Sequence, residues 1–284
     1  MAKTIGNPIS WSARQLGRTG EHIASSTSQL GGEDQSEPVV SALTIGDLHA
    51  SLWAGWDDFL ACRTDAVFAV LIYPLVGLAL IAFGFQADNL PKLFPLIAGF
   101  ALLGPVAAVG LYEMSRRREL GLPVNWHCVF SVLRSPSFGA IFVLGLYLLG
   151  LFLFWMLTAV ALYNWTIGPG TPESLRGFLS DVFTTPRGWA LILLGNAIGF
   201  LFALCALAIS VVSFPLLLEL KVGVPVAIVT SVRVLRASPF VTLVWGAIVA
   251  LGLMLGTIPF LAGLIVIMPV LGHSTWHLYR RAVA

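Results

Sequence analysis

The sequence predicts an all-α fold, a multi-pass transmembrane helical bundle of about six spans arranged as three hairpins, with amphipathic interfacial helices. Composition is the first evidence. Apolar residues make up 57% of the 284 residues and charged residues only 11%, against roughly 45–50% and 25% in soluble domains. The mean hydropathy of +0.89 is the second. So few charges cannot cover a surface that faces water, so most of this surface faces lipid.

Charge and cysteine content exclude several other classes. The 16 basic and 14 acidic residues leave a net charge of +2, which gives no reason to expect a nucleic-acid partner. Cys62, Cys128 and Cys205 are too scattered for a disulfide framework or a Cys-x-x-Cys metal site. The sequence also lacks a Walker loop, a Ser-x-x-Lys motif and a His-Glu-x-x-His motif. We therefore expect no enzyme activity, no catalytic residues and no cofactor.

The chain divides into a polar tail at 1–42 and a membrane domain at 43–284. The tail contains a serine-rich run at 25–28 and Glu33-Asp34. It lacks the apolar core of about 7–15 residues that a secretory signal needs. Its composition predicts a disordered cytoplasmic segment.

The membrane domain begins with a predicted interfacial helix at 47–64. Thr44 and Asp47 form a capping-box pattern at its start. Trp53 and Trp56 suit the headgroup region, where an indole ring is buried and its N–H stays wet. Residues three and four apart form the expected apolar side, edged by an arginine: Leu48, Leu52, Trp56, Phe59, Leu60 and Arg63.

Five apolar runs follow, and each reaches the roughly 20 residues that a membrane-crossing helix needs. The runs are 67–85, 93–114, 138–163, 189–218 and 240–279. The last is too long for one crossing, and a break at 256–259 divides it into 240–256 and 259–278, although a re-entrant arrangement is the alternative. The expected hairpins are therefore 67–114, 138–218 and 240–279. The outer loop 164–188 carries a further amphipathic helix that begins near Thr171-Pro172.

Basic residues predict the orientation, because cytoplasmic segments are enriched in them. With the amino terminus inside, only Lys92, Arg176 and Arg187 of the 16 Lys and Arg residues fall outside. This bias favours an even number of spans with both termini cytoplasmic. The expected location is a bacterial cytoplasmic (inner) membrane, with anionic lipid headgroups as contacts of the basic residues.

An internal repeat appears at an offset of 102 residues. Gly121-Leu-Pro-Val matches Gly223-Val-Pro-Val, and Val132-Leu-Arg matches Val234-Leu-Arg. Proline in a first helical turn and arginine near the other end predict two short amphipathic interfacial helices, at 123–134 and 225–236. Repeated hairpins are typical of transporters, but an odd number of them favours duplication of a packing unit.

Candidate contact residues lie at the interface and at helix crossings. Arg116, Arg117 and Arg118, with Trp53 and Trp56, are the predicted lipid or partner contacts. Two Gly-x-x-x-Gly motifs are predicted to mediate helix packing, and their glycines are Gly195, Gly199, Gly252 and Gly256. Gly104-Pro105 predicts a kink. Asp57 and Asp58 diverge by about 100° on a helix and are expected on a solvated face.

His273 and His277 are the candidate metal ligands. Residues four apart share a helix face, which suits two imidazoles on one metal ion or one of them on a haem iron. His49 and His127 are the further imidazoles that would be needed to complete such a site. The alternative interpretation is an interfacial belt of His, Trp and Tyr that ends in Arg280-Arg281.

Four sequence blocks resemble a known family. They are 52–59 (LWAGWDDF), 98–105 (AGFALLGP), 110–121 (GLYEMSRRRELG) and 272–280 (GHSTWHLYR). Together they are similar to the bacterial predicted integral membrane proteins known as domain of unknown function 2189, across about 45–280. This resemblance implies a multi-pass inner-membrane protein without an established activity. Labels that link some members to cytochrome oxidase imply an accessory role, because the intramembrane histidines of an oxidase subunit are missing here.

Two hypotheses follow. The first is a non-enzymatic accessory or interaction protein of a respiratory or other membrane complex, which contacts the lipid bilayer and a membrane-protein partner. The alternative is a small-solute transporter or a metal- or haem-handling protein that uses His273 and His277. The empty mid-depth of the spans, which lack Asp, Glu, Lys and Arg there, favours the first.

Overall fold

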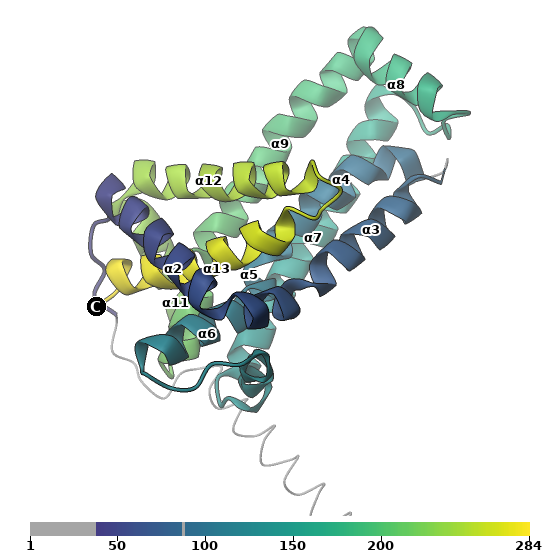
Figure 1. The fold of residues 1–284 in the computed structure, drawn as a ribbon. Helices are drawn as coiled ribbons and strands as arrows, with labels where there is room; N and C mark the ends of the chain where they lie inside the picture. The colour runs from purple at the N-terminus through teal and green to yellow at the C-terminus, as the bar shows by residue number, and fades with distance from the viewer. Residues whose placement is uncertain (1–37, 87–88) are drawn as a thin grey trace, which may run out of the picture.

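The computed structural model describes residues 38–86 and 89–284 and confirms the all-α, multi-pass class (Figure 1). Within these residues the only β-structure is one isolated bridge. The helices are α2 (Ile45–Val70), α3 (Ile72–Gly84), α4 (Leu90–Phe100), η2 (Ala101–Leu103), α5 (Gly104–Ala107), α6 (Val109–Glu119), η3 (Trp126–Arg134), α7 (Phe138–Thr166), α8 (Leu175–Thr184), α9 (Pro186–Ser210), α10 (Ser213–Glu219), α11 (Val224–Ala237), α12 (Pro239–Thr257) and α13 (Leu264–Ala282).

Five segments of the described chain are long and apolar enough to cross a membrane. They are Ile45–Gly84, Leu90–Glu119, Phe138–Thr166, Pro186–Glu219 and Pro239–Thr257. The expected sixth span, 259–278, is not among them. Turns occupy 258–263, and α13 begins at Leu264 and carries polar residues from His273 onward.

The two ends of the described chain are paired with each other. Val40 and Val283 form an antiparallel bridge, with hydrogen bonds of 2.9 Å from Ser41 N to Ala282 O and 3.0 Å from Ala284 N to Val39 O. Most of the predicted tail, 1–37, lies outside the described residues, but 38–42 run beside the carboxyl terminus. The two ends of the described chain therefore lie at the same place in the fold.

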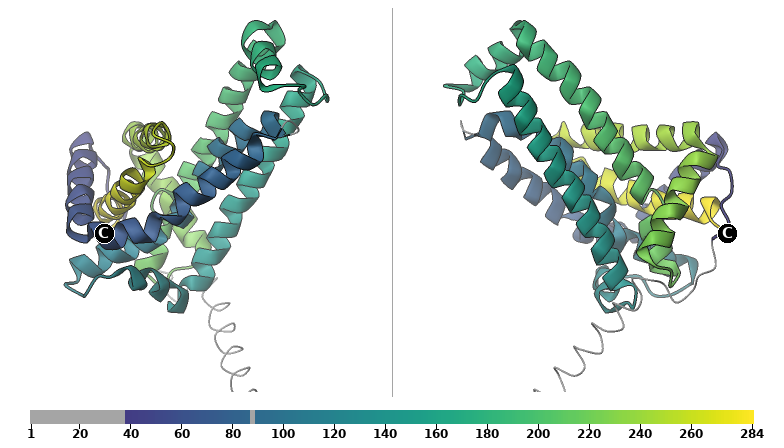
Figure 2. Two further views of the ribbon diagram at one scale, coloured as in Figure 1. Left: turned by 45° about the vertical axis from the view of Figure 1, so that its right-hand side comes forward. Right: turned by 180° about the vertical axis from the view of Figure 1, so that it is seen from behind.

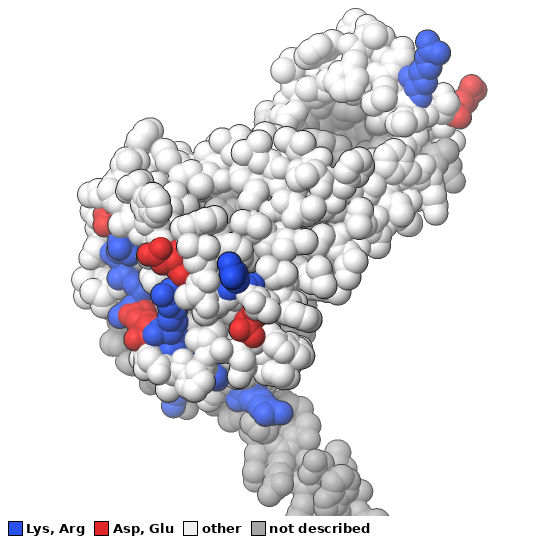
Figure 3. Space-filling model, viewed as in Figure 1, with Lys and Arg blue, Asp and Glu red and all other residues white. Residues whose placement is uncertain are grey.

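Charged side chains gather at the two ends of the molecule. On the face shown in Figure 3, most Lys, Arg, Asp and Glu lie at the end formed by α2, α6 and the carboxyl terminus. A few appear at the opposite tip, near α8, and the surface between is uncharged in this view. This distribution leaves an apolar zone that suits the hydrocarbon of a bilayer. We call the end with most charges the charged end.

Helices α2 and α13 are antiparallel neighbours at the charged end, and they approach so closely that only a glycine fits between them. A Cβ atom on Gly55 would lie 2.1 Å from Ser274 Oγ and 2.5 Å from Ser274 N. Ser51 and Gly55 of α2 are buried, whereas Trp56 and Leu60 are 38% and 48% exposed. In lipid, small residues let helices approach and apolar side chains face outward.

The buried side of α2 is therefore different from the apolar side that the sequence predicted. Leu48 and Phe59 of that predicted side are buried, but Trp56 and Leu60 are exposed. The capping box of Thr44 and Asp47 is present as predicted. The helix also extends past residue 64 to Val70, with a kink at Cys62 (φ −117°, ψ 18°).

The second membrane segment is broken near its middle. A 3₁₀ turn (η2) and the short α5 separate α4 from α6, and the break falls at the Gly104-Pro105 step that predicted a kink. Proline removes a backbone donor and disturbs the preceding turn, which accounts for the break. Irregular backbone at this depth needs partners, and Tyr73 Oη supplies one by donating to Ala107 O at 2.6 Å.

Helices α7 and α9 lie side by side and are joined at the far tip by α8, the predicted outer amphipathic helix (Figure 2). A Cβ on Gly199 would lie 3.2 Å from the Trp155 ring of α7. A Cβ on Gly195 would lie 3.7 Å from Leu162, also of α7. Gly252 and Gly256 of α12 face side chains of α13 in the same way, at 3.2 and 2.7 Å.

The two members of the internal repeat adopt different helices. Residues Val224–Ala237 form an α-helix (α11) with proline in its first turn, as predicted. The matching segment begins three residues after its proline and forms a 3₁₀ helix (η3), nine residues long. Such helices rarely exceed three or four residues. The start of η3 is held from outside the repeat, because Trp126 N donates to Asp65 Oδ1 at 2.9 Å.

Substituting Gly55 by Ala tests the α2–α13 contact. The added methyl group would collide with the backbone of Ser274, so we expect α2 to be displaced at a cost of about 1–3 kcal/mol. The thermal unfolding midpoint in detergent should fall by several degrees. Gly150→Ala is the matched control, because a Cβ there meets nothing within 4 Å. An unchanged midpoint for Gly55→Ala would contradict the close approach.

Candidate functional site

A buried carboxylate, Asp58 of α2, is the centre of a polar cluster at the charged end. Its side chain is 7% exposed. Ser115 Oγ of α6 donates to Asp58 Oδ2 at 2.6 Å, and His277 Nε2 of α13 lies 2.8 Å from the same oxygen. Arg118 of α6 forms an ion pair with the other oxygen. Three helices are thereby tied to one carboxylate.

His273 extends this cluster by one hydrogen bond. Its ring is fully buried, and Nδ1 lies 2.7 Å from Ser115 Oγ. The hydroxyl group has one proton, which it gives to Asp58 because an ionised carboxylate only accepts. His273 Nδ1 therefore carries a proton and donates to Ser115 Oγ, an assignment made from the network. Burial lowers the pKa of His273 to about 4, so the ring is neutral at pH 7. Its Nε2 is then unprotonated, and it is buried without a hydrogen-bond partner.

The arginine cluster predicted to contact lipid is engaged within the chain. Glu113, buried in α6, accepts from Arg117 Nε at 2.7 Å and pairs with Arg116 at 3.2 Å. The third member, Arg118, belongs to the Asp58 cluster. These arginine side chains remain 27–41% exposed, so each can contact solvent or headgroups while it is paired with a carboxylate, which Arg116 and Arg117 share.

A second group of ion pairs fixes the end of α13. Arg280 bridges Glu119 at 3.1 Å and Glu219 at 2.8 Å. Tyr279 Oη donates to Glu219 at 2.6 Å, and Trp276 Nε1 donates to Glu119 at 2.9 Å. Burial and the Glu219 carboxylate both raise the pKa of Tyr279. Burial opposes the charge of Arg280, but the two carboxylates outweigh it and raise its pKa.

The Asp58 cluster contains serine, histidine and aspartate, but their order differs from that of a nucleophilic triad. In a triad the imidazole lies between the hydroxyl and the carboxylate and removes the hydroxyl proton. Here Ser115 lies between Asp58 and His273, and its proton already points to the carboxylate. Ser115 is also only 1% exposed. This geometry connects three helices, and it differs from that of an activated serine.

His273 and His277 lie on the same face of α13, as their spacing predicted, and each already has a side-chain partner. The other proposed imidazoles lie elsewhere: His49 accepts from Trp53 Nε1 at 2.9 Å, and the His127 ring lies tilted against the ring of Trp126. Over 38–86 and 89–284, no three His, Cys, Asp or Glu side chains are placed to hold a metal ion. Metal or haem binding at His273 and His277 stays a prediction.

The sequence interpretation of Asp58 was wrong. Asp57 is exposed, but Asp58 is 5% exposed and sits at the centre of the cluster instead of on a solvated face. Adjacent helical positions diverge, so one of the pair faces α13 while the other faces outward. Ser115 carried no signal of its own. Three of the quoted sequence blocks, 52–59, 110–121 and 272–280, nevertheless contain every member of the cluster.

Replacing Asp58 by Asn tests whether the carboxylate holds the three helices. The amide leaves Arg118 without a counter-charge, and it places an NH₂ group beside the donors of Ser115 and Arg118. A broken buried pair costs about 3–5 kcal/mol, and partial exposure of Arg118 reduces this to roughly 2–4 kcal/mol. The thermal midpoint in detergent should fall accordingly. Asp57→Asn is the control and should change stability by less than about 0.5 kcal/mol; equal effects of the two would refute the role of Asp58.

Comparison with known proteins supports the family resemblance. No curated protein and no solved structure matches the chain. Residues 93–219 match the model of a family described as predicted integral membrane proteins of the DUF2189 type. This region runs from α4 through α10 and includes Ser115 and Arg118, whereas Asp58 and both histidines lie outside it. Over residues 93–219, which are less than half of the chain, the sequence is thus similar to this family of predicted integral membrane proteins.

Proposed function

We propose that this protein is a non-enzymatic interaction protein, an accessory subunit that binds a membrane-protein partner at its charged end. The observation that carries the proposal is an exposed aromatic surface formed by Phe68, Trp126 and Phe130. Their side chains are 64%, 39% and 54% exposed. The Trp126 ring centroid lies 6.3 Å from that of Phe68 and 6.0 Å from that of Phe130.

The placement of this aromatic surface suits recognition. Trp126 N is bonded to Asp65, and η3 ends at Arg134, so the rings lie among the polar groups of the charged end. Aromatic side chains are enriched in protein interfaces because they bury a large area at low entropy cost. The nearby carboxylates of the charged end are engaged by partners within the chain. The exposed rings are therefore the groups at this place that we expect to contact another protein.

The proposed location is the bacterial inner membrane, with the charged end in the cytoplasm. Paired chain ends and the concentration of Arg at that end support this orientation, because cytoplasmic segments are enriched in basic residues. The tip that carries α8 then faces outward.

Small-solute transport is a second candidate, and one observation favours it. The broken helix α4–η2–α5–α6 lines a cavity of about 690 Å³, and broken helices line the binding sites of many transporters. The side chains around this cavity are almost all apolar. It therefore suits an apolar molecule better than an ion or a sugar.

Cysteine labelling tests the topology. In a variant with Cys62, Cys128 and Cys205 replaced by Ala, single cysteines at Val39, Gly170 and Ala284 report on three exposed sites. A membrane-impermeant maleimide added to intact cells should label only Gly170→Cys. The other two should react only after the membrane is opened. Labelling of one chain end from outside, with the other protected, would contradict the even number of crossings.

Affinity purification tests the partner. The tagged full chain, cross-linked in its native membrane and extracted in mild detergent, should retain one membrane protein in a fixed ratio. Replacing both Trp126 and Phe130 by Ala should reduce the recovery of that protein by about tenfold, which corresponds to about 1.4 kcal/mol. Trp165→Ala is the matched control, since this indole is 75% exposed at the end of α7 that leads to α8.

Two results would refute this function. One is recovery of the native chain as a monomer without any co-purifying protein. The other is equal loss of the partner in the Trp165→Ala control and in the Trp126/Phe130 variant, which would show that the aromatic surface is not the contact.

A further inference from the structure

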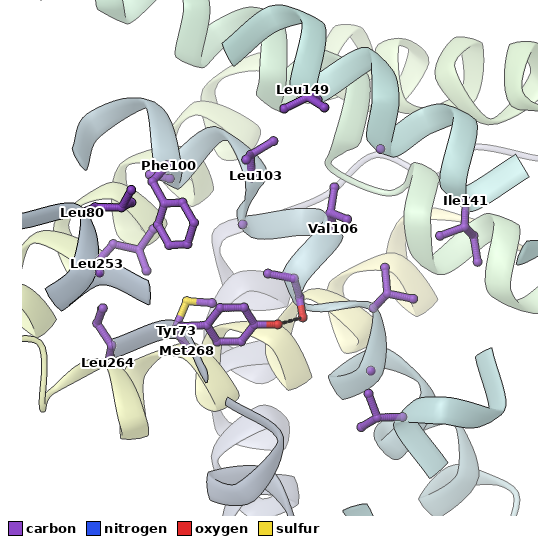
Figure 4. A pocket seen from close by; sticks show the side chains of 18 of the residues that line it. Tyr73, Leu80, Phe100, Leu103, Val106, Ile141, Leu149, Leu253, Leu264 and Met268 are labelled. Carbon is purple, nitrogen blue, oxygen red and sulfur yellow. Dashed lines mark hydrogen bonds between the residues drawn. The ribbon is translucent and has the colours of Figure 1, made fainter. Parts of the chain in front are cut away.

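The cavity of about 690 Å³ lies among the membrane-crossing helices (Figure 4). Its walls come from four of the five membrane segments, with α13 and η3 closing two sides. Representative side chains are Leu80 of α3, Phe100 of α4, Leu149 of α7, Leu253 of α12 and Met268 of α13. Its volume falls within the range of about 300–1,000 Å³ typical of ligand sites.

The polar groups in these walls already have partners. Tyr73 Oη donates to Ala107 O at 2.6 Å, as the dashed line in Figure 4 shows, and Thr257 Oγ1 donates to Met254 O at 2.6 Å. Lys, Arg, Asp, Glu and His are missing from the lining. A cavity of this kind offers water no hydrogen bonds. Hydrocarbon is the occupant that its chemistry accepts, and the surrounding bilayer supplies it.

A smaller polar pocket of about 260 Å³ adjoins this cavity, and Val132 of η3 lines both. The polar pocket is bordered by Arg116, Lys221, Glu113 and Glu219, together with Ser131, Ser135 and Ser137. Both carboxylates also pair with basic groups outside the pocket, Glu113 with Arg117 and Glu219 with Arg280. Arg280 also pairs with Glu119, so four cations lie among three carboxylates, which leaves a small excess of positive charge at the pocket.

We propose that the two spaces together bind one glycerophospholipid, with an acyl chain in the apolar cavity and the phosphate in the polar pocket. Charge complementarity selects the phosphate, since Arg and Lys at the charged end face an anion at the depth where headgroups lie. The shared wall at Val132 places the polar and apolar parts of one amphiphile next to each other. This site goes beyond the proposed partner contact and does not depend on it.

Filling the cavity tests the acyl-chain site. Gly145 of α7 lines it, and a Cβ there would only make ordinary contacts of 3.6 Å with Val106. Gly145→Phe therefore adds a ring to the cavity without displacing backbone. Gly150→Phe, on the same helix but outside the cavity lining, is the matched control. Leu146→Trp fills the same space and serves if the first variant does not fold, as judged by size-exclusion elution.

The measurement is native mass spectrometry of the full chain, stripped of lipid in detergent and titrated with phosphatidylglycerol. The wild type and Gly150→Phe should each bind one lipid per chain, and Gly145→Phe should bind with about tenfold lower affinity. Diacylglycerol with the same chains tests the phosphate. The wild type should prefer phosphatidylglycerol, and Arg116→Gln with Lys221→Gln should reduce that preference about tenfold. Arg63→Gln, an exposed change, should preserve it.

The outcomes separate the two parts of the site. Equal lipid binding by Gly145→Phe, Leu146→Trp and the wild type would refute the acyl-chain site. Equal affinity of the wild type for diacylglycerol and phosphatidylglycerol would refute the phosphate site. Oleic acid that binds as tightly as phosphatidylglycerol would also refute the phospholipid assignment. These lipid-binding results do not depend on whether the Trp126/Phe130 variant loses its protein partner.

Discussion

The need to neutralise one buried carboxylate governs the architecture of the charged end. An ionised Asp58 at 5% exposure is costly without partners. Its partners come from α6 and α13, so these helices can occupy only positions that bring Ser115, Arg118 and His277 to it. Gly55 has no side chain, which allows α2 to approach Ser274 of α13 closely enough for these contacts. Packing and electrostatics thus specify the same arrangement of three helices.

Hydropathy and its periodicity were enough to predict the helical class, the first five membrane segments and the helix α8. The side on which α2 packs could not be predicted from them. In a soluble protein, apolar residues such as Trp56 and Leu60 would be expected to face the core. In a bilayer they can face the lipid, and small residues are favoured at helix contacts. The sixth expected span was uncertain for a related reason: α13 uses its polar second half, with His273 and His277, to meet α2 and α6 instead of lipid.

The polar cluster was only partly predictable. The i, i+4 spacing placed both histidines on one face, and the four family blocks marked the right segments. Sequence did not show that these segments meet, because 57 residues separate Asp58 from Ser115 and 158 separate Ser115 from His273. A repeat likewise predicts similar helices but not the contact of Asp65 with Trp126 that accompanies the 3₁₀ form of η3.

The pairing of the two chain ends has a consequence for biosynthesis. His277 follows Asp58 by 219 residues, which a ribosome takes roughly 10–40 s to add at about 5–20 residues per second. For most of that interval α2 has left the ribosome while α13 does not yet exist, so the Asp58 carboxylate lies in water or at the lipid headgroups without His277. The Asp58 cluster can therefore form only after α13, the last helix of the chain, has been synthesised. A chain that stops before α13 leaves Asp58 without His277.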